Sequence, residues 1–302
     1  MKKQDKFSAT WLSHSSIGDY LKCPRLYYLK NVWKNENKRK VNIVSPHMSL
    51  GSAVHQVIEP LGLIPVEKRL ELITPPNLPL ERGGTEHPLL SDFEEVWKKY
   101  TGRMGGFEDA ETEEVFKKRG IEMIKNVIAN PGPLKNKTVK FYQGDFIPNI
   151  YLSEKENIIL CGLVDWVEYN EKNDTLRVID FKTGKNDEKE DSFQLPIYKI
   201  LVESLQKRKV ENGAYWYLDR DKNMVTKELL DEDIEEIKNQ ILKIGLEIKS
   251  KNKKEENFKC KYNPDCWECK AFELIYDFKN NSDKVEYLGV GEYKQDLYLI
   301  KN

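Results

Sequence analysis

The chain has 302 residues, of which 33% are charged and 39% hydrophobic, and its formal net charge at pH 7 is −1. No apolar run approaches the length of a transmembrane helix, so we expect no membrane partner. Residues 1–6 are not followed by the apolar segment of a signal peptide, and a cytoplasmic protein is therefore expected. In a reducing compartment, five cysteines favour metal ligation or free thiols over disulfides.

A basic stretch lies near the N-terminus. Between Lys22 and Lys40 there are seven basic side chains and one acidic side chain, Glu36. Aromatic residues are interleaved with them: Tyr20, Tyr27, Tyr28 and Trp33. Basic groups for phosphates and aromatic rings for bases are typical of proteins that bind single strands. The alternative is a solvated helix face with a few core aromatics.

Helical patterns dominate the first half of the chain. We expect helices at residues 13–23, 48–59, 92–100 and 110–129. Ser13 is the N-cap candidate of the first helix, and His55 lies beside the apolar stripe of the second. Residues 72–92 contain four prolines and two adjacent glycines without periodicity, and are interpreted as a mobile loop or insertion.

The pattern then changes to β-branched and aromatic residues. We expect strands at residues 140–147, 158–169, 176–182 and 213–219. The polar residues 170–175 predict a hairpin turn between the second and third of these strands. A helix is expected at residues 191–207, in which Pro196 is tolerable only if it lies in the first turn. An amphipathic helix begins at Asp231, followed by the late cysteines and a polar tail. Helices around a central sheet predict an α/β fold.

Two aspartates interrupt apolar strands, Asp165 and Asp180, and Lys182 follows the second. Alternate residues of a strand share a face, so Asp180 and Lys182 can converge on one ligand. If the hairpin forms, Asp165 approaches Asp180, and two carboxylates suit Mg²⁺ or Mn²⁺. Such an ion would polarise a scissile phosphate and acidify a bound water, while Lys182 would place that water or offset charge on the phosphate. The alternative is a surface hairpin with a cross-strand charge pair.

Four of the five cysteines form a second candidate centre: Cys23, Cys260, Cys266 and Cys269. Four thiolates can hold a 4Fe–4S cluster or a structural zinc ion, which would join the two ends of the chain. Chance clustering of free thiols is the alternative. Cys161 lies among apolar residues on an expected strand and is interpreted as a buried thiol.

Five sequence motifs resemble, in the same order, those of the PD-(D/E)XK nucleases. The closest similarity is to the RecB-like branch, which includes CRISPR-associated and AddB-type members with four cysteines. The motifs are Ser-x-Ser-x4-Tyr-x2-Cys-Pro-Arg at 13–25, Gly-Ser-Ala-Val-His at 51–55, Gly-Leu-Val-Asp at 162–165, Asp-Phe-Lys-Thr-Gly at 180–184 and Gln-Leu-Pro-Ile-Tyr at 194–198. The resemblance extends over residues 13–272.

This resemblance implies a restriction-endonuclease-like core, in which helices flank a central mixed β-sheet, with a helical insertion and a cysteine–metal lobe joining the chain ends. A single nuclease domain would span residues 1–302. Its core would lie at about 138–220, its helical region at about 48–130, and its cysteine lobe at about 13–40 and 258–272.

The resemblance also implies a role for each motif residue. The metal ligands would be His55, Asp165, Asp180 and the Phe181 backbone carbonyl. Lys182 would be the catalytic lysine, and Gln194 and Tyr198, one helical turn apart, would position the lysine or the DNA backbone. Taken without the motifs, His55 is better interpreted as a core histidine beside an apolar stripe; taken with them, it is interpreted as a metal ligand.

The cysteines of the resembled families hold a 4Fe–4S cluster, with a late triplet spaced Cys-x2-Cys-x5-Cys. Here the spacing is reversed, Cys260-x5-Cys266-x2-Cys269. This reversed spacing leaves the role of Cys260 as the fourth ligand open, and it keeps zinc as the alternative metal. A centre of either kind would be structural, because phosphodiester hydrolysis moves no electrons, and removing it would impair folding first.

The sequence therefore predicts a metal-dependent DNA exonuclease acting on single-stranded ends, in repair, recombination or CRISPR spacer processing. Because no phosphate-loop motor motif occurs, the chain would work alone or with a separate helicase or integrase complex. The alternative is a catalytically inactive nucleic-acid-binding or scaffold subunit, against which the presence of Asp165, Asp180 and Lys182 argues. A zinc-knuckle binding protein without a nuclease core would leave the central motifs unexplained.

Overall fold

The computed structural model describes residues 6–74, 87–142, 147–220, 224–262 and 266–301. The chain divides into two compact units. Unit 1 comprises Met1–Ser45, Asn149–Cys161 and Glu235–Asn302, and unit 2 comprises Pro46–Pro148 and Gly162–Ile234. None of the helices within the described residues is long and apolar enough to cross a membrane.

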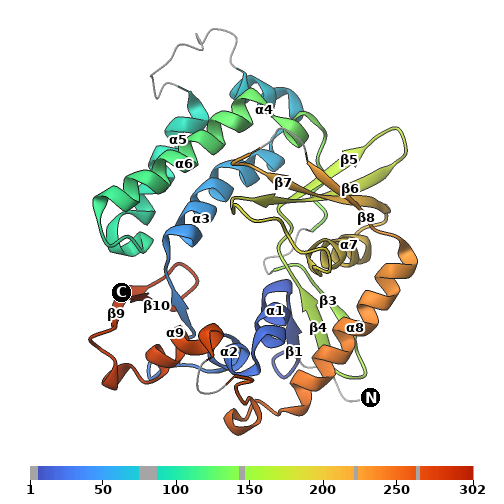
Figure 1. Ribbon diagram of the computed structural model, residues 1–302. Helices are drawn as coiled ribbons and strands as arrows, with labels where there is room; N and C mark the ends of the chain where they lie inside the picture. Colours follow the sequence, from blue (N-terminus) through green and yellow to red (C-terminus); the bar gives the residue numbers. More distant parts are fainter. Residues whose placement is uncertain (1–5, 75–86, 143–146, 221–223, 263–265, 302) are drawn as a thin grey trace. The chain divides into compact units, whose positions relative to one another are not determined.

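Unit 2 contains a four-stranded mixed sheet in the order β5-β6-β7-β8 (Figure 1). Its strands are β5 (Trp166–Asn170), β6 (Thr175–Lys182), β7 (Val210–Tyr217) and β8 (Val225–Glu228). β5 and β6 form the predicted hairpin, with Trp166 opposite Ile179. β6 and β7 are parallel, which requires a crossover, and the helix α7 (Gln194–Leu205) provides it. Both the predicted α/β class and the mixed central sheet are confirmed.

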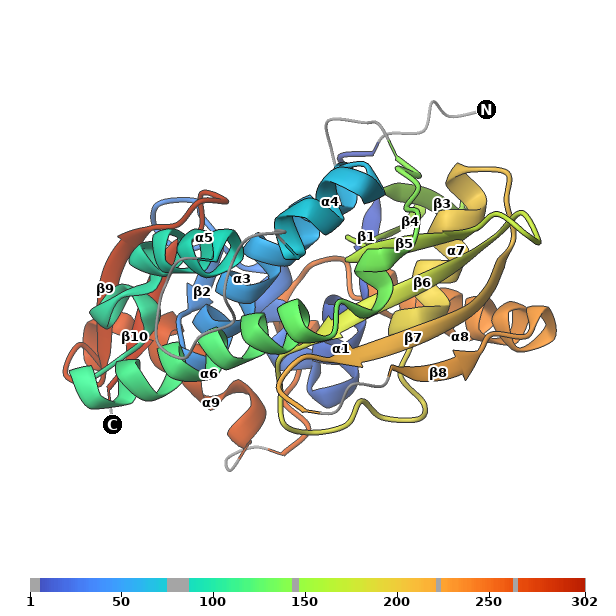
Figure 2. The ribbon, with the colours of Figure 1, turned by 90° about the horizontal axis from the view of Figure 1, so that it is seen from above.

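The helical part of unit 2 precedes this sheet in the sequence. Its α-helices are α3 (Pro46–Ile58), α4 (Val66–Ile73), α5 (Pro88–Trp97) and α6 (Ala110–Ala129), and its short 3₁₀ helices are Glu59–Leu63, Lys98–Tyr100, Gly102–Gly105 and Gly132–Lys135. α3 buries Leu50, Val54 and Val57, the stripe expected of an amphipathic helix. α3, α5 and α6 pack side by side (Figure 2). Gly120 allows this approach, since a Cβ there would lie 2.3 Å from the Phe93 ring.

The strand β6 is buried on both faces. Ile179 and Phe181 belong to the hydrophobic core that the helices α3, α5 and α6 complete. Asp180 instead accepts hydrogen bonds from side chains of α7. The two faces of the same strand therefore serve different purposes, one for packing and one for polar chemistry.

Arg69 of α4 has no exposed surface and no carboxylate partner among the described residues. Its guanidinium group donates hydrogen bonds to four backbone carbonyls and one hydroxyl: those of Leu61, Ile64, Leu134, Asn136 and Thr138. It also lies 4.8 Å from the centroid of the Trp166 ring. Every donor direction of the group is therefore satisfied. The hydrogen bonds tie α4 to residues 61–64 and 134–138, and the ring contact ties it to the start of β5.

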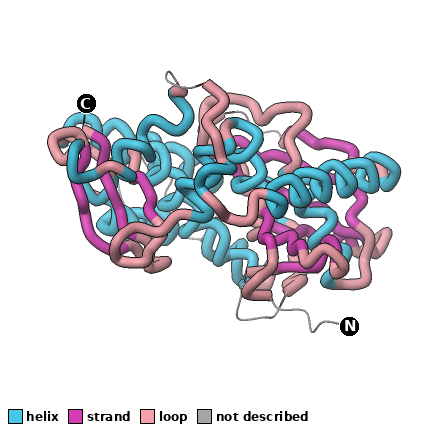
Figure 3. The backbone as a smooth tube through the Cα atoms, turned by 90° about the horizontal axis from the view of Figure 1, so that it is seen from below, coloured by secondary structure: helices cyan, strands magenta, loops and turns pink. Residues whose placement is uncertain are grey.

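Unit 1 contains two three-stranded sheets, ordered β1-β4-β3 and β2-β10-β9. Their strands are β1 (Thr10–Leu12), β4 (Ile158–Cys161), β3 (Asn149–Ser153), β2 (Val41–Ile43), β10 (Asp296–Ile300) and β9 (Val285–Val290). The second sheet lies beside the C-terminus in Figure 3.

The helices of unit 1 are mostly short. They are α1 (His14–Lys22), α2 (Pro24–Tyr27), the π-helix Tyr28–Val32, α8 (Asp231–Ser250, in this unit from Glu235), the 3₁₀ helices Glu255–Asn257 and Phe278–Asn280, and α9 (Trp267–Tyr276). Ser13 caps α1 as predicted, in a capping box in which Ser13 and Ser16 bond each other's backbone amides.

Several predicted strands differ from those observed. The run expected at 158–169 is two strands in different sheets, because the Gly162 amide bonds the Pro148 carbonyl and Asp165 bonds the Phe181 amide. In the run expected at 140–147, no strand forms among the described residues 140–142 and 147, and residues 143–146 lie outside the described part. Just before this run, an isolated bridge pairs Thr138 with Glu168.

Two segments expected to be irregular are partly ordered. The expected polar tail forms the hairpin β9–β10, and β10 is buried because it is the middle strand of its sheet, which removes the alternating pattern. Within residues 72–92, α4 extends to Ile73 and α5 begins at Pro88, since proline suits the first turn of a helix. Residues 75–86 lie outside the described part.

The aromatic residues of the basic stretch are mainly core residues. Tyr20, Tyr27 and Tyr28 are buried, and Tyr27 stacks on Phe258 with ring centroids 5.8 Å apart. The interpretation of these three tyrosines as base-stacking residues is therefore wrong. Only Trp33 of the four is partly exposed.

Candidate active site and metal centres

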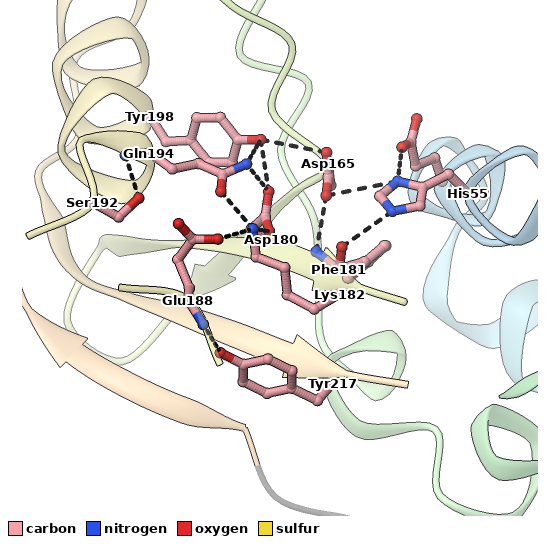
Figure 4. A network of polar contacts seen from close by, with 11 residues as sticks. His55, Asp165, Asp180, Phe181, Lys182, Glu188, Ser192, Gln194, Tyr198 and Tyr217 are labelled. Atoms are coloured by element: carbon pink, nitrogen blue, oxygen red, sulfur yellow. Dashed lines mark hydrogen bonds and ion pairs between the residues drawn. The ribbon is translucent and has the colours of Figure 1, made fainter. Parts of the chain in front are cut away.

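The predicted catalytic side chains come together in unit 2, at the end of β6 (Figure 4). Their positions are His55 on α3, Asp165 directly before β5, Asp180 and Lys182 on β6, and Gln194 and Tyr198 on α7. The hairpin register brings Asp165 beside β6, and the one-turn spacing of Gln194 and Tyr198 places both above it.

The ammonium group of Lys182 is surrounded by three oxygen atoms. Its Nζ lies 2.6 Å from Gln194 Oε1, 2.7 Å from Glu188 Oε2 and 3.0 Å from Asp180 Oδ2. Burial alone would lower the pKa of Lys182, but the charges and hydrogen bonds of Asp180 and Glu188 raise it. The lysine is therefore held as a cation at a fixed position, where it can stabilise negative charge.

Asp180 is the most buried acid of the group, with 3% of its surface exposed. Its Oδ1 accepts hydrogen bonds from the Tyr198 hydroxyl at 2.9 Å and from Gln194 Nε2 at 2.5 Å. Its Oδ2 has the Lys182 ammonium as a neighbour but accepts no well-directed hydrogen bond from the described residues. A buried carboxylate oxygen in this state is suited to a cation.

Tyr198 connects the two aspartates. Its hydroxyl lies 2.9 Å from Asp180 Oδ1 and 3.5 Å from Asp165 Oδ1. Burial and the two aspartate charges raise the pKa of Tyr198 well above its ordinary value. The hydroxyl therefore remains a hydrogen-bond donor that fixes the carboxylates.

Both ring nitrogens of His55 face oxygen atoms. Nδ1 lies 2.6 Å from Glu59 Oε1 and 3.7 Å from Asp165 Oδ2, and Nε2 lies 3.1 Å from the Phe181 carbonyl oxygen. Burial alone would lower the pKa of His55, but the Glu59 hydrogen bond and the charges of Asp165, Glu59 and Asp180 raise it to about 9. Because a carboxylate and a carbonyl both accept hydrogen bonds, the surroundings of the ring favour its protonated form.

This donor set fits a divalent ion. His55, Glu59 and Asp165 offer ligand atoms within 4.8 Å of one another. Neighbouring ligands of an octahedral ion at about 2.1 Å lie about 3.0 Å apart, close to the 3.1 Å between His55 Nε2 and the Phe181 carbonyl oxygen. With His55 Nε2 as the ligand atom, Glu59 would not itself bind the ion; its hydrogen bond to Nδ1 would orient the ring, a usual arrangement for a ligating histidine.

Two acidic residues at this site are absent from the sequence prediction. Glu59 is four residues after His55, so its position could have been inferred from the helical repeat. Glu188 lies in the connection between β6 and α7, where no sequence period indicates which side chain returns to Lys182. Its amide donates to the Tyr217 hydroxyl at 2.9 Å, which holds the connection in place.

Metal affinity at this site is expected to increase with pH. Burial and the charge of Asp180 raise the pKa of Asp165, and the pKa of His55 is raised to about 9. Near neutral pH both groups bind protons that an ion must displace, so affinity should rise by up to about tenfold per pH unit for each displaced proton until pH exceeds about 9. Titration calorimetry with Mn²⁺ between pH 6 and 8, in buffers of different ionisation enthalpy, would count these protons. An affinity independent of pH would contradict this reasoning.

The four predicted cysteines also come together, in unit 1. The Sγ atoms of Cys23, Cys260, Cys266 and Cys269 lie within 4.8 Å of one another. Cys23 to Cys260 is 3.8 Å and Cys260 to Cys269 is 3.7 Å. Burial and the neighbouring thiols raise the pKa of Cys269, so a bound cation is needed to keep it a thiolate near neutral pH.

The surroundings of these cysteines connect the two ends of the chain. Arg25, two residues after Cys23, bonds Glu273 of α9 through Nε and Nη2 at 2.6 and 3.1 Å, and Glu255 through Nη1 at 2.6 Å. Cys161 is not part of the cluster. It is buried, its Sγ bonds the Leu12 carbonyl, and burial raises its pKa to about 11, as expected of an inert thiol.

The comparison with family models identifies the superfamily. The model described as the PD-(D/E)XK nuclease superfamily matches residues 11–272, which include both the polar site on β6 and all four clustered cysteines. No curated protein matches the chain. The mixed sheet flanked by helices is consistent with the restriction-endonuclease-like core of this superfamily, whose members are nucleases that typically use divalent metals. The chain belongs to the PD-(D/E)XK nuclease superfamily.

Proposed function

We propose that this protein is a divalent-metal-dependent DNA exonuclease of the RecB-like branch, acting on single-stranded ends. The observation that supports it most strongly is the convergence of His55, Asp165 and Asp180 beside the Phe181 carbonyl, with the Lys182 ammonium 3.0 Å from Asp180. Carboxylate and carbonyl oxygens that can bind a divalent ion, with a fixed cation beside them, suit metal-dependent phosphodiester hydrolysis.

Each residue has a distinct task in this proposal. A bound Mg²⁺ or Mn²⁺ would polarise the scissile phosphate and acidify the attacking water. Lys182 offsets the negative charge that develops on the phosphate and orients the water. Gln194 and Glu188 hold the ammonium through hydrogen bonds of 2.6 and 2.7 Å, and Tyr198 holds Asp180.

The preference for single-stranded ends rests on the resemblance to the RecB-like branch, and on the basic stretch of residues 22–40. Repair, recombination and CRISPR spacer processing are the proposed settings, with a separate helicase or integrase complex as the proposed partner. These 302 residues hold no phosphate-loop motif, so a motor would lie outside them.

The four cysteines are proposed to hold a structural metal centre. The resemblance implies a 4Fe–4S cluster. The edge of a ZnS₄ tetrahedron, with Zn–S near 2.3 Å, is about 3.8 Å, and two of the Sγ separations, 3.8 and 3.7 Å, match it. A cluster of four irons needs wider sulfur spacing, so these two separations favour zinc as the alternative metal.

The test is degradation of end-labelled single-stranded DNA in the presence of Mn²⁺ or Mg²⁺, beside a circular single strand of the same sequence. We expect the linear strand to be degraded from its ends, the circle to survive, and EDTA to stop the reaction. Cleavage of the circle would replace the exonuclease by an endonuclease. Binding of the strand without any cleavage, in metal-loaded folded protein, would favour a binding subunit.

A further inference from the structure

Unit 1 contains two adjoining cavities that share Asn31, Lys34 and Lys40 in their linings. Their volumes are about 720 and 660 Å³. The first extends along β1 and α8 and includes Trp11, and the second extends over β2 and the turn before β10 and includes Tyr293. None of these residues belongs to the polar site on β6 or to the cysteine centre.

The linings of these cavities are strongly basic. Eight lining residues carry a positive charge: Lys30, Lys34, Lys38, Arg39, Lys40, Lys249, Lys253 and Lys294. The acidic lining residue, Asp19, already accepts hydrogen bonds from Lys30 and Asn31. The whole chain has a net charge of only −1, so positive potential is concentrated here, and concave walls focus it further.

The shared lysines, Lys34 and Lys40, are among the five basic lining residues that form no ion pair with a described carboxylate. Three of the eight basic groups are paired with carboxylates: Lys30 with Asp19, Arg39 with Asp296, and Lys249 with Glu156. Lys34 and Lys40 have no such partner among the described residues, although both reach solvent. Partial desolvation lowers the pKa of Lys40, and the nearby charge of Lys34 lowers it further. An anion between the two would relieve both effects.

The loop that carries these lysines is held in place by one buried acid. Asp296 of β10 has no exposed surface and accepts hydrogen bonds from Asn35 at 2.6 Å, Asn37 at 2.9 Å and Arg39 at 3.2 Å. Its own amide bonds the Lys40 carbonyl. The side chains of Asn35 and Arg39 thus point to Asp296, while Lys34 and Lys40 line the cavities. The backbone that carries the two lysines is therefore held in place, which lowers the cost of binding a ligand.

We propose that these two cavities bind the phosphodiester backbone of a single DNA strand, with Lys34 and Lys40 contacting phosphates and Tyr293 stacking on a base. Two joined cavities of this size are larger than one phosphate group requires. Tyr293 is 81% exposed at the rim, and an exposed ring beside lysines is the arrangement that single-strand binders use. The inference deepens the proposed function and rests on DNA being its substrate.

The test is fluorescence anisotropy with a labelled single strand of thymidylates, in EDTA so that no cleavage is possible. The variant Lys34→Gln/Lys40→Gln should bind about tenfold more weakly than the parent at low salt. Its slope of log affinity against log salt should decrease by about 1.4, because each phosphate contact on a single strand contributes about 0.7. The matched control, Lys238→Gln/Lys279→Gln, makes the same charge change on lysines paired with Glu235 and Glu36 outside the cavities, and should retain parental affinity and slope.

A second variant separates stacking from charge. Tyr293→Ala should weaken single-strand binding several-fold with an unchanged salt slope, while Tyr293→Phe should bind like the parent. If the Lys34→Gln/Lys40→Gln variant binds as tightly as the parent, the proposed site is overturned. It is also overturned if the control variant loses as much affinity as the Lys34→Gln/Lys40→Gln variant. If Tyr293→Ala has no effect and duplex binding falls with the lysine pair as much as single-strand binding, the single-strand assignment is overturned.

The binding measurement is independent of catalysis. If the protein does not cleave DNA, single-strand binding and its dependence on Lys34 and Lys40 would still be observed. Failure of the cavity proposal would leave metal-dependent cleavage intact at saturating DNA. In the active protein, the Lys34→Gln/Lys40→Gln substitution should raise KM for DNA, while kcat stays near that of the parent.

Discussion

Replacing Lys182 by alanine is expected to slow metal-dependent DNA cleavage by about a thousandfold, measured under single-turnover conditions. The ammonium of Lys182 lies within 3.0 Å of oxygen atoms of Asp180, Glu188 and Gln194. Its position and charge are therefore fixed before any substrate arrives. Without the Lys182 ammonium group, the negative charge that develops on the phosphate is no longer offset by this cation.

The control must show that the metal site survives. Lys182→Ala should still bind Mn²⁺, because the lysine donates no ligand, and Lys185→Ala, an exposed lysine three residues later, should cleave at nearly the parental rate. If parent and Lys182→Ala are both inert with metal bound, the protein is a binding subunit. Equal cleavage by both would mean that Lys182 is not the catalytic lysine, or that the activity comes from a contaminant.

The polar site could be predicted because its geometry is mostly local. Asp180 and Lys182 share a face through the two-residue period of β6, and Gln194 and Tyr198 share one through a helical turn. Asp165 reaches Asp180 through a hairpin whose turn is readable as a polar segment. The motif order supplied His55, which no local period connects to the sheet.

Other features depend on tertiary contacts that leave no periodic signal. Glu188 returns to Lys182 from an irregular connection, and Arg69 is satisfied by carbonyls spread over more than seventy residues of sequence. β10 gives no alternating pattern in the sequence, because a middle strand is buried on both faces. Lys34 and Lys40 were recognisable as basic, but the buried Asp296 that arranges their loop is far away in the sequence.

Replacing Cys23 by serine is expected to release the metal of the cysteine centre and to destabilise unit 1. Cys23 lies between α1 and α2, whereas Cys266 and Cys269 lie at the start of α9, so the centre joins segments more than two hundred residues apart. Loss of a structural metal removes its binding free energy from folding, and we expect about 4 kcal/mol or more. The midpoint of thermal unfolding should then fall by roughly 10 °C.

The matched control for this variant is Cys161→Ala, which removes a buried thiol outside the cluster. It should keep the full metal content and lose less stability, because Cys161 bonds only a backbone carbonyl, that of Leu12. Elemental analysis and visible absorption of anaerobically purified protein identify the metal at the same time. Zinc without visible absorption would agree with Sγ separations of 3.8 and 3.7 Å, whereas iron with visible absorption would show that the four cysteines move apart to admit a cluster. Unchanged metal content and stability in Cys23→Ser would remove Cys23 from the centre. The two ends of the chain would then be joined by contacts such as the Arg25–Glu273 pair without help from a metal.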